Sequence, residues 1–396
     1  MKEKVVLAYS GGLDTSVAIK WLKDKGYDVI AYMADVGQKS DFKTYSKRAL
    51  KTGASKVVIE NLKEEFVEDF VFKSLKANAV YEGGYLLATA LSRPLIAKGL
   101  VKAAQKFKAR FAAHGCTGKG NDQVRFEVTI RALDPSLNII APAREWELKT
   151  RMDEIKYAKK NNIPIDATAE KPYSLDVNLW GVSIESGKLE DPYYEPGEDI
   201  YQLTKGVDRA KGEPAYVEVE FKNGAPVKLN GRSIAGADLI SKLSKIAGDA
   251  GVGRSDMIEN RLVGIKSREI YEAPAAWSLT TAHKALESLV LDRETLHFKE
   301  LIALKYAELV YYGLWYTPLK SALDKLIDET QKAVNGTVRL KLHKGSCVVV
   351  GRKSSNSLYR KELATYEKGD KFDQSLAKGF IELWGLPYKG LRRDVI

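Results

Sequence analysis

The chain has 396 residues, enough for two or three domains, and its 44% hydrophobic and 29% charged residues are typical of a soluble globular protein. No apolar run approaches the roughly 18 residues that a membrane span needs, and the first residues lack the apolar core of a signal peptide. The net charge of +11 would suit nucleic acid or anionic small substrates, but the lysines are spread along the chain without a long block. We therefore expect a cytoplasmic protein that binds neither membranes nor nucleic acid.

The first strand, turn and helix form the most informative segment, Ala8-Tyr9-Ser10-Gly11-Gly12-Leu13-Asp14-Thr15-Ser16. The free N–H groups of a first helical turn and the positive end of the helix dipole attract an anion, and the glycines allow it to approach closely. Neither a Walker A sequence nor a dinucleotide-binding G-x-G-x-x-G follows the first strand. The string S-G-G-x-D-[ST] instead resembles the pyrophosphate loop of the N-type ATP pyrophosphatases, which cleave ATP between its α and β phosphates.

Apolar strand-like runs alternate with amphipathic helical patterns through the first 165 residues. The predicted strands are Val5–Tyr9, Val29–Met33, Lys56–Ile59, Arg110–His114 and Asn138–Ala141. The predicted helices are Thr15–Lys25, Phe42–Thr52, Lys63–Ala77, Arg93–Lys108 with a cap at Ser92, Asp122–Ala132, and Met152–Asn161 with a capping box at Thr150 and Asp153. This alternation predicts a parallel sheet with helices on both faces, so the loops that end at its carboxyl edge should share one ligand site.

A second unit follows a polar, proline-rich stretch that we interpret as a connector over residues 164–200. The turn signal Asn223-Gly224 predicts a hairpin, and a further hairpin is expected over residues 337–351. Between them we expect a helix at 236–249, an extended segment at 261–271 and two long helices at about 294–312 and 319–334. An amphipathic pattern predicts one more helix over Asp373–Trp384.

The second informative loop follows the predicted fourth strand and reads H-G-C-T-G-K-G-N-D-Q-V-R-F from His114 to Phe126. Its three glycines would make it mobile, and it carries a hydroxyl, an amide, a carboxylate and a guanidinium. This set could recognise an amino acid, with Asp122 facing the α-amine and Arg125 forming a fork with the α-carboxylate. Taken alone, the segment could equally be a glycine-rich loop without a ligand.

Both loops and many shorter strings resemble argininosuccinate synthase, from Val5 to about Phe380. The matching strings include Gly37-Gln38-Lys39, Tyr85-Leu86-Leu87, Arg93-Pro94, Gly251-Val252-Gly253-Arg254, Glu259-Asn260-Arg261, Lys266-Ser267-Arg268, Ile270-Tyr271-Glu272 and Ala307-Glu308-Leu309-Val310-Tyr311. The resemblance implies a ligase that joins citrulline to aspartate through a citrullyl-adenylate while ATP goes to AMP and pyrophosphate. It also implies an α/β fold: a doubly wound, Rossmann-like parallel sheet of the HUP or PP-loop type, a second α+β synthetase domain, and a C-terminal oligomerisation helix.

The resemblance further implies domains at residues 1–165, 166–365 and 366–396, a homotetramer, and ATP used with Mg²⁺, without predicted protein ligands for a metal. ATP would be bound by Ala8, Tyr9, Ser10, Gly11, Gly12, Leu13, Asp14, Thr15, Ser16, Ala34 and Gly115, and aspartate by Thr117, Asn121 and Asp122. Citrulline would be bound by Tyr85, Thr89, Asn121, Arg125, Ser174, Ser183, Glu259 and Tyr271. The residues expected to act in catalysis are Asp14, Asp122 and Arg125.

Two positions depart from the family's pattern. Ala90 stands where a serine would touch citrulline, so Thr89 or a water would have to substitute. Cys116 stands where alanine is usual, and a nucleophilic cysteine would suggest a tRNA-thiolating enzyme of the same fold. The only other cysteine is the distant Cys347, so we interpret Cys116 as an inert small residue. The residues are also compatible with an ammonia-using synthetase of the same fold or a nucleotide-binding regulatory module without turnover.

Overall fold

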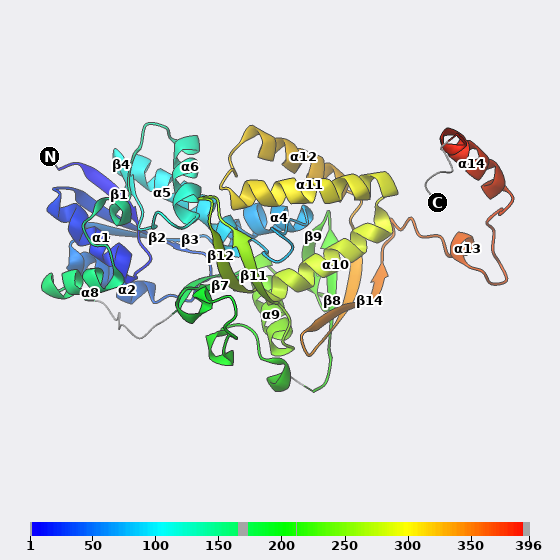
Figure 1. Cartoon of the computed structure of the whole chain (residues 1–396), viewed down its shortest axis with the longest axis horizontal. Helices are drawn as coiled ribbons and strands as arrows, with labels where there is room; N and C mark the ends of the chain where they lie inside the picture. The colour runs from blue at the N-terminus through cyan, green and yellow to red at the C-terminus, as the bar shows by residue number, and fades with distance from the viewer. Residues whose placement is uncertain (1, 165–172, 211, 391–396) are drawn as a thin grey trace. The chain divides into compact units, whose positions relative to one another are not determined.

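The computed structural model describes residues 2–164, 173–210 and 212–390, and the chain divides into two compact units, Met1–Asn356 and Ser357–Ile396 (Figure 1). The predicted domain boundary at 165/166 lies outside the described residues, and the boundary at 365/366 stays a prediction. Within the described ranges, no helix combines the length and the apolar character that crossing a membrane would require.

The N-terminal part of the first unit is built on a five-stranded sheet in the order β3-β2-β1-β4-β5, with every neighbouring pair parallel. The strands are β1 (Lys4–Ala8), β2 (Asp28–Asp35), β3 (Lys56–Asn61), β4 (Phe111–Ala113) and β5 (Asn138–Ile140). Val5 and Leu7 pack into one hydrophobic cluster and Val6 into another, because both faces of β1 are covered. The predicted doubly wound sheet is confirmed.

The helices of this part cover the two faces of the sheet. Residues of α1 and α8 share one cluster with the sheet, and residues of α5 and α6 share the other. The helices are α1 (Leu13–Asp24), α2 (Phe42–Thr52), α3 (Lys63–Phe66), the π-helical η1 (Val67–Val71), α4 (Phe72–Lys76), α5 (Ala88–Phe107), α6 (Asp122–Leu133), α7 (Pro142–Glu145) and α8 (Arg151–Lys160). The capping box predicted for α8 is confirmed, since Thr150 and Asp153 bond reciprocally.

Two helix predictions in this part are wrong in detail. The helix α5 begins at Ala88 after Leu87, so Ser92 does not cap it and Pro94 lies inside it. The hydroxyl of Ser92 instead donates to the carbonyl of Thr89, a local bond that a serine inside a helix commonly makes. The helix predicted over Lys63–Ala77 is interrupted by the π-helical η1, which periodicity alone does not reveal.

A four-stranded antiparallel sheet, in the order β11-β12-β7-β6, is formed by the chain's middle section. Its strands are β6 (Ser174–Asn178), β7 (Gly181–Glu185), β11 (Arg254–Asn260) and β12 (Lys266–Glu272), and short 3₁₀ turns follow β7 at η2 (Gly187–Glu190), η3 (Glu198–Ile200) and η4 (Val207–Arg209). For residues 173–200 the prediction of a connector is therefore wrong, and residues 165–172 of that stretch lie outside the described residues. The strands β6 and β7 form a hairpin whose turn is closed by the Asn178 side chain, which accepts from Trp180 N and Gly181 N.

A five-stranded antiparallel sheet in the order β10-β9-β8-β13-β14 completes the first unit with four helices. Its strands are β8 (Ala215–Lys222), β9 (Ala225–Leu229), β10 (Arg232–Ser233), β13 (Gly336–His343) and β14 (Ser346–Lys353), and the helices are α9 (Gly236–Asp249), α10 (Pro274–Val290), α11 (Arg293–Tyr311) and α12 (Pro318–Gln331). Both predicted hairpins are confirmed, and Asn223 and Gly224 both have positive φ, as a type I′ turn requires. The helix α10 was not predicted from the sequence; most of its residues are buried, so it lacks a polar face.

The second unit, Ser357–Ile396, contains α13 (Lys361–Ala364), α14 (Leu376–Gly385) and η5 (Leu386–Tyr388). The helix predicted over Asp373–Trp384 is confirmed as α14. None of its residues is buried, and its large apolar side chains are exposed.

Candidate active site

The turn between β1 and α1 has the geometry of an anion site. Gly11 has φ +82°, a conformation that side chains disfavour, and a Cβ there would lie 2.3 Å from the Tyr45 ring. Gly12 is the N-cap of α1 and provides no side-chain cap. The first N–H groups of α1 therefore lack the side-chain acceptor that usually occupies them, and the positive end of the helix faces the turn.

The turn is held from behind by side chains. Arg48 of α2 donates to the Gly11 carbonyl at 2.8 Å while its guanidinium lies 5.4 Å from the centre of the Tyr45 ring. The Ser10 and Thr15 hydroxyl oxygens lie 3.1 Å apart, and the Ser10 N–H donates to the Thr15 hydroxyl at 3.3 Å. The loop is thus fixed before a ligand arrives.

The sheet order places the two informative loops next to each other. The strands β1 and β4 are neighbours, and their following loops leave from the same carboxyl edge. A Cβ on Gly115 would lie 2.9 Å from the methyl carbon of Thr15, so the two loops are in contact. Ala34 lies near the same edge, at the end of β2, and is buried. The predicted ATP residues all lie at the carboxyl ends of β1, β2 and β4, in the loops that follow, or in the first turn of α1: Ala8, Tyr9, Ser10, Gly11, Gly12, Leu13, Asp14, Thr15, Ser16, Ala34 and Gly115.

A cavity of about 260 Å³ opens beside these loops and extends to the four-stranded sheet. Its wall includes twelve of the predicted site residues: Asp14, Tyr85, Thr89, Gly115, Thr117, Asn121, Asp122, Arg125, Ser174, Ser183, Glu259 and Tyr271. The remaining wall residues are Cys116, Gly120, Asp176, Glu185, Arg261 and Glu269. Six of these eighteen residues are carboxylates and two are arginines. The chain has a net charge of +11, but the excess of basic residues does not lie in the cavity wall.

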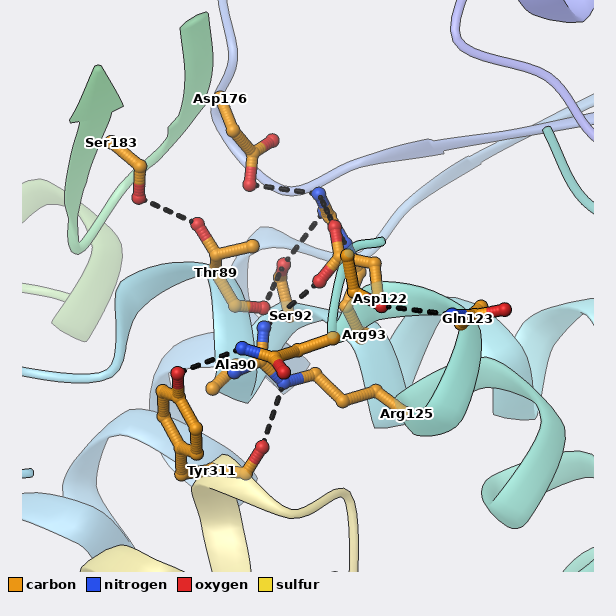
Figure 2. Close-up of polar contacts among 12 residues, drawn as sticks. Thr89, Ala90, Ser92, Arg93, Asp122, Gln123, Arg125, Asp176, Ser183 and Tyr311 are labelled. Atoms are coloured by element: carbon orange, nitrogen blue, oxygen red, sulfur yellow. Dashed lines mark hydrogen bonds and ion pairs between the residues drawn. The ribbon is translucent and has the colours of Figure 1, made fainter. Parts of the chain in front are cut away.

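Asp122, the first residue of α6, lies between two arginines (Figure 2). Arg93 Nε donates to Oδ2 and Arg125 Nη1 donates to Oδ1, each at 2.9 Å. Although burial opposes ionisation, these two charges hold the Asp122 pKa below its ordinary value. A carboxylate that stays ionised and fully engaged can orient an ammonium or amine but is a poor proton acceptor.

Arg93 also joins the two parts of the first unit. Its Nη2 donates to Asp176 on β6 at 2.8 Å, while its Nε holds Asp122 on α6 (Figure 2). The fork geometry of a guanidinium allows both bonds at once.

Glu259, near the end of β11, is buried and accepts two phenol hydroxyls. Tyr271 on β12 donates to Oε2 and Tyr311 at the end of α11 donates to Oε1, each at 2.6 Å. Burial raises the Glu259 pKa, while the two phenols and the nearby guanidinium of Arg125 oppose that rise. The cavity wall therefore carries a carboxylate and a guanidinium, the two groups that recognition of a zwitterion requires.

The hydroxyl groups of the wall come from different elements. Thr89 on α5 and Ser183 on β7 are hydrogen-bonded at 2.9 Å (Figure 2). Ser174 lies on β6. Tyr85 stacks on Tyr271 with ring centres 4.1 Å apart, so both tyrosines pack together as well as line the cavity.

Ala90 is fully buried, and its N–H donates to the Tyr85 hydroxyl at 3.1 Å. It contributes no side chain to the wall, whereas the neighbouring Thr89 does line the cavity.

Asp14 forms a carboxyl pair with Glu154 of α8. Burial and the hydrogen bond with Asp14 raise the Glu154 pKa to about 9. At neutral pH this raised pKa favours the protonated form of Glu154.

The glycine-rich loop is anchored at both ends. Cys116 N–H donates to His114 Nδ1 at 3.2 Å, and His114 Nε2 lies 3.2 Å from the Glu127 carboxylate. Arg261 Nη1 reaches the Lys119 carbonyl at 3.4 Å and the Arg261 guanidinium also pairs with Glu269. Burial raises the pKa of the Cys116 thiol, which agrees with an inert residue rather than a thiolate nucleophile.

Sequence reasoning missed Arg93, Asp176, Glu185, Arg261, Glu269 and Tyr311 as parts of the site. Arg93, Arg261 and Tyr311 stood in strings that match the family, so that signal could have found them. Asp176 and Glu185 stood in the supposed connector, and only its recognition as a hairpin would have placed them.

Comparison with known proteins identifies the family. A model described as the arginosuccinate synthase N-terminal HUP domain matches residues 4–164, and one described as the arginosuccinate synthase C-terminal domain matches residues 173–391. Relatives named argininosuccinate synthase include that of Caldanaerobacter subterraneus subsp. tengcongensis, 58% identical over 98% of this chain and 95% of its own length. Those of Carboxydothermus hydrogenoformans and Aquifex aeolicus are 56% and 55% identical over 98% and 99% of this chain and 97% and 98% of theirs.

Solved structures give a weaker comparison. A 4-thiouridine synthetase–RNA complex with bound ATP matches 41% of this chain and 41% of its own, at 18% identity and a TM-score of 0.29. Such a match is too slight to support an inference about function. The two family models and the nearly full-length relatives agree, and this chain belongs to the argininosuccinate synthase family.

Proposed function

We propose that this protein condenses citrulline with aspartate to form argininosuccinate, converting ATP to AMP and pyrophosphate. The proposal rests on one observation. The turn between β1 and α1, where no side chain caps the helix, borders a cavity whose wall also carries the guanidinium of Arg125 and the buried carboxylate of Glu259. Relatives at 55–58% identity over nearly the whole chain carry the name of this activity.

The ATP phosphates would lie over the loop from Ala8 to Ser16, with Ala34 and Gly115 against the rest of the nucleotide. The uncapped N–H groups at the start of α1 support this assignment, because they suit a developing negative charge on a leaving pyrophosphate. A Cβ at Gly115 would meet Thr15, so the close contact of the two loops also depends on a glycine there.

Citrulline would lie against Tyr85, Thr89, Asn121, Arg125, Ser174, Ser183, Glu259 and Tyr271, and aspartate against Thr117, Asn121 and Asp122. In this assignment Arg125 faces a carboxylate and Glu259 faces an ammonium group. The Thr89 hydroxyl would contact citrulline in place of the serine hydroxyl that is missing at Ala90. The position of Thr89 in the cavity wall supports this assignment.

The reaction would proceed in two steps. The ureido oxygen of citrulline attacks the α-phosphorus of ATP and pyrophosphate leaves, giving a citrullyl-adenylate. The aspartate amine then attacks the ureido carbon, AMP leaves with the ureido oxygen, and the amine loses a proton. Neither step needs a covalent enzyme nucleophile, so positioning and charge stabilisation would supply the catalysis.

Asp122 would orient the aspartate amine rather than remove its proton, because two arginines keep its pKa low. Arg125 would fix the citrulline carboxylate while it orders Asp122. Asp14 would act at the phosphate end, where it lines the cavity beside the loop.

Mg²⁺ would accompany ATP. Among the described residues no group of three or more histidine, cysteine or acidic side chains is placed to hold a metal. Mg²⁺ commonly binds through one or two carboxylates together with phosphate oxygens and water, and Asp14 is the carboxylate within the loop that suits this arrangement. When bound, the ion would neutralise charge on the phosphates.

We also propose a homotetramer to which the C-terminal unit contributes. The exposed apolar side chains of α14, which include Leu376, Phe380, Ile381 and Trp384, support a contact with another subunit. Truncation after Gly369 should convert the tetramer to smaller species in light-scattering measurements, and an unchanged tetramer would contradict the idea. A cytoplasmic location stays a prediction.

The activity is tested by incubating the purified protein with Mg²⁺, ATP, citrulline and aspartate, omitting each substrate in turn. The proposal expects AMP, pyrophosphate and argininosuccinate in equal amounts, and only with all substrates present. Formation of ADP, or ATP binding without any AMP, would refute it.

A further inference from the structure

We propose that Tyr311 is a positioning residue that orients both amino acids by holding Asn121, Glu259 and Arg125 in one arrangement. The inference rests on the proposed function and deepens it. Tyr311 is fully buried and is not among the residues of the cavity wall, so it acts through the residues that are.

Tyr311 reaches the site because the end of α11 packs against the start of α6. Tyr311 is the last residue of α11, and Gly313 follows with φ +74°. A Cβ on Gly313 would lie 2.7 Å from the Arg125 Cα, so only a glycine permits this approach. The Tyr311 ring is stacked on Tyr81 with centres 3.7 Å apart and planes 8° apart, which fixes its plane.

The hydroxyl of Tyr311 links two side chains of the cavity wall. Asn121 Nδ2 donates to it at 2.8 Å, and it donates in turn to Glu259 Oε1 at 2.6 Å. The direction is set by chemistry, because an amide nitrogen can only donate and a carboxylate can only accept. The Tyr311 proton therefore serves Oε1 of Glu259, while the Tyr271 phenol serves Oε2.

The Leu262 backbone N–H fixes the orientation of the Asn121 amide, and the Tyr311 hydroxyl accepts one of the two N–H groups of that amide. Asn121 Oδ1 accepts the backbone N–H of Leu262 at 2.9 Å, and a reversed amide would set two donors against each other. One N–H of Asn121 donates to Tyr311, which leaves the second available to a ligand in the cavity. The Tyr311 hydroxyl thus helps to hold the Asn121 amide in the orientation that presents an N–H group to the substrates.

The backbone and ring of Tyr311 hold Arg125. The Tyr311 carbonyl accepts Arg125 Nε at 2.9 Å (Figure 2), and the guanidinium carbon lies 4.8 Å from the ring centre. The carbonyl at a helix C-terminus is a favourable partner for a cation. Removal of the phenol oxygen would leave this contact in place, so the hydroxyl can be tested separately.

The test is Tyr311→Phe, compared with Tyr306→Phe. Tyr306 is a matched control because it lies on α11, is fully buried, and donates its hydroxyl to a carboxylate, Asp324, at 2.8 Å, but it lines no part of the cavity. Tyr271→Phe removes the other phenol from Glu259 without touching Asn121.

We expect Tyr311→Phe to raise the KM for citrulline and for aspartate about tenfold each, with the KM for ATP changed less than about twofold. Tyr271→Phe should raise the KM for citrulline alone, and Tyr306→Phe should leave all three values near those of the unmodified protein. Thermal unfolding of all variants is measured alongside. If Tyr311→Phe and Tyr306→Phe lower the unfolding temperature by a similar amount but only Tyr311→Phe raises the KM values, a purely structural cause is excluded.

A pH profile gives a second readout. Glu259 is faced by the phenols of Tyr271 and Tyr311, by Arg125 of α6 and by Arg261. Without the Tyr311 hydroxyl the ionised form of Glu259 loses a donor, so the acid limb of kcat/KM for citrulline should move up by about half a pH unit or more. Tyr306→Phe should not move it.

The inference is overturned if Tyr311→Phe matches Tyr306→Phe in every kinetic value, or if its effect falls equally on ATP. Failure of the proposed function itself is distinguishable, because the unmodified protein would then form no AMP with all substrates present.

Discussion

Replacement of Gly11 by alanine should disturb the turn between β1 and α1 more than the same replacement at a glycine whose Cβ would meet open space. An alanine held at φ +82° costs about 1–2 kcal/mol relative to glycine. Its Cβ would also lie 2.3 Å from Cδ2 of the Tyr45 ring, and relieving such overpacking costs typically about 1–3 kcal/mol. The expected destabilisation is the sum, about 2–5 kcal/mol.

A shifted loop should also bind ATP less well. If two N–H bonds to phosphate are lost, each worth about 1.5 kcal/mol for a charged partner, the affinity falls about 100-fold. Urea unfolding measures the stability, and calorimetric titration with ATP measures the affinity.

Gly26→Ala is the matched control. Gly26 has φ +94°, but a Cβ there would meet nothing within 4 Å, so this variant carries the backbone cost without the clash. It should lose about 1–2 kcal/mol and keep its ATP affinity. Equal losses of stability and of ATP affinity in Gly11→Ala and Gly26→Ala would refute the reasoning.

Three further predictions concern charge and titration. The lowered pKa of Asp122 contributes stability that is present above about pH 4 and is lost as the pH falls through that pKa. Arg93→Met should therefore lower the free energy of unfolding by about 1–3 kcal/mol at pH 7 in urea, and the difference from the unmodified protein should shrink toward about pH 3. A difference that does not depend on pH would count against this role of Arg93. Because Glu154 is protonated at about pH 7.5, Glu154→Gln should keep the KM for ATP within about twofold at that pH. Above about pH 9 Glu154 gains a negative charge beside Asp14, so the unmodified protein should lose ATP affinity whereas Glu154→Gln should keep it. Cys116→Ala should keep kcat within about twofold, and Cys116 should resist alkylation at about pH 7, whereas a large loss of kcat would favour a thiolate nucleophile.

The sequence was sufficient for the first sheet and for the two loops that meet at its edge. The strands β1 and β2 are apolar on both faces because helices cover both faces of the sheet, and each strand therefore appears in the sequence as a continuous apolar run. Parallel strands end at a common edge, so the contact between Thr15 and Gly115 follows from the strand order. The turn at Asn223 and Gly224 was predictable because a type I′ turn needs positive φ at both positions.

The remaining parts of the site depend on contacts that leave no local pattern. The β6–β7 hairpin alternates polar and apolar residues over only five positions per strand, and the prolines and aspartates around it favour a loop prediction. Arg125 and Tyr311 are 186 residues apart, and nothing near either one indicates the other. Tyr311 lies within an amphipathic helix, where a buried tyrosine is usually a packing residue.

The central claim is that the ureido oxygen of citrulline attacks ATP, and isotope transfer tests it most directly. Citrulline labelled with ¹⁸O in the ureido group is turned over with ATP, Mg²⁺ and aspartate, and the AMP is analysed by mass spectrometry. Attack by the ureido oxygen predicts one ¹⁸O in the phosphate of each AMP and none in pyrophosphate. AMP without the label, or label in pyrophosphate, would contradict it.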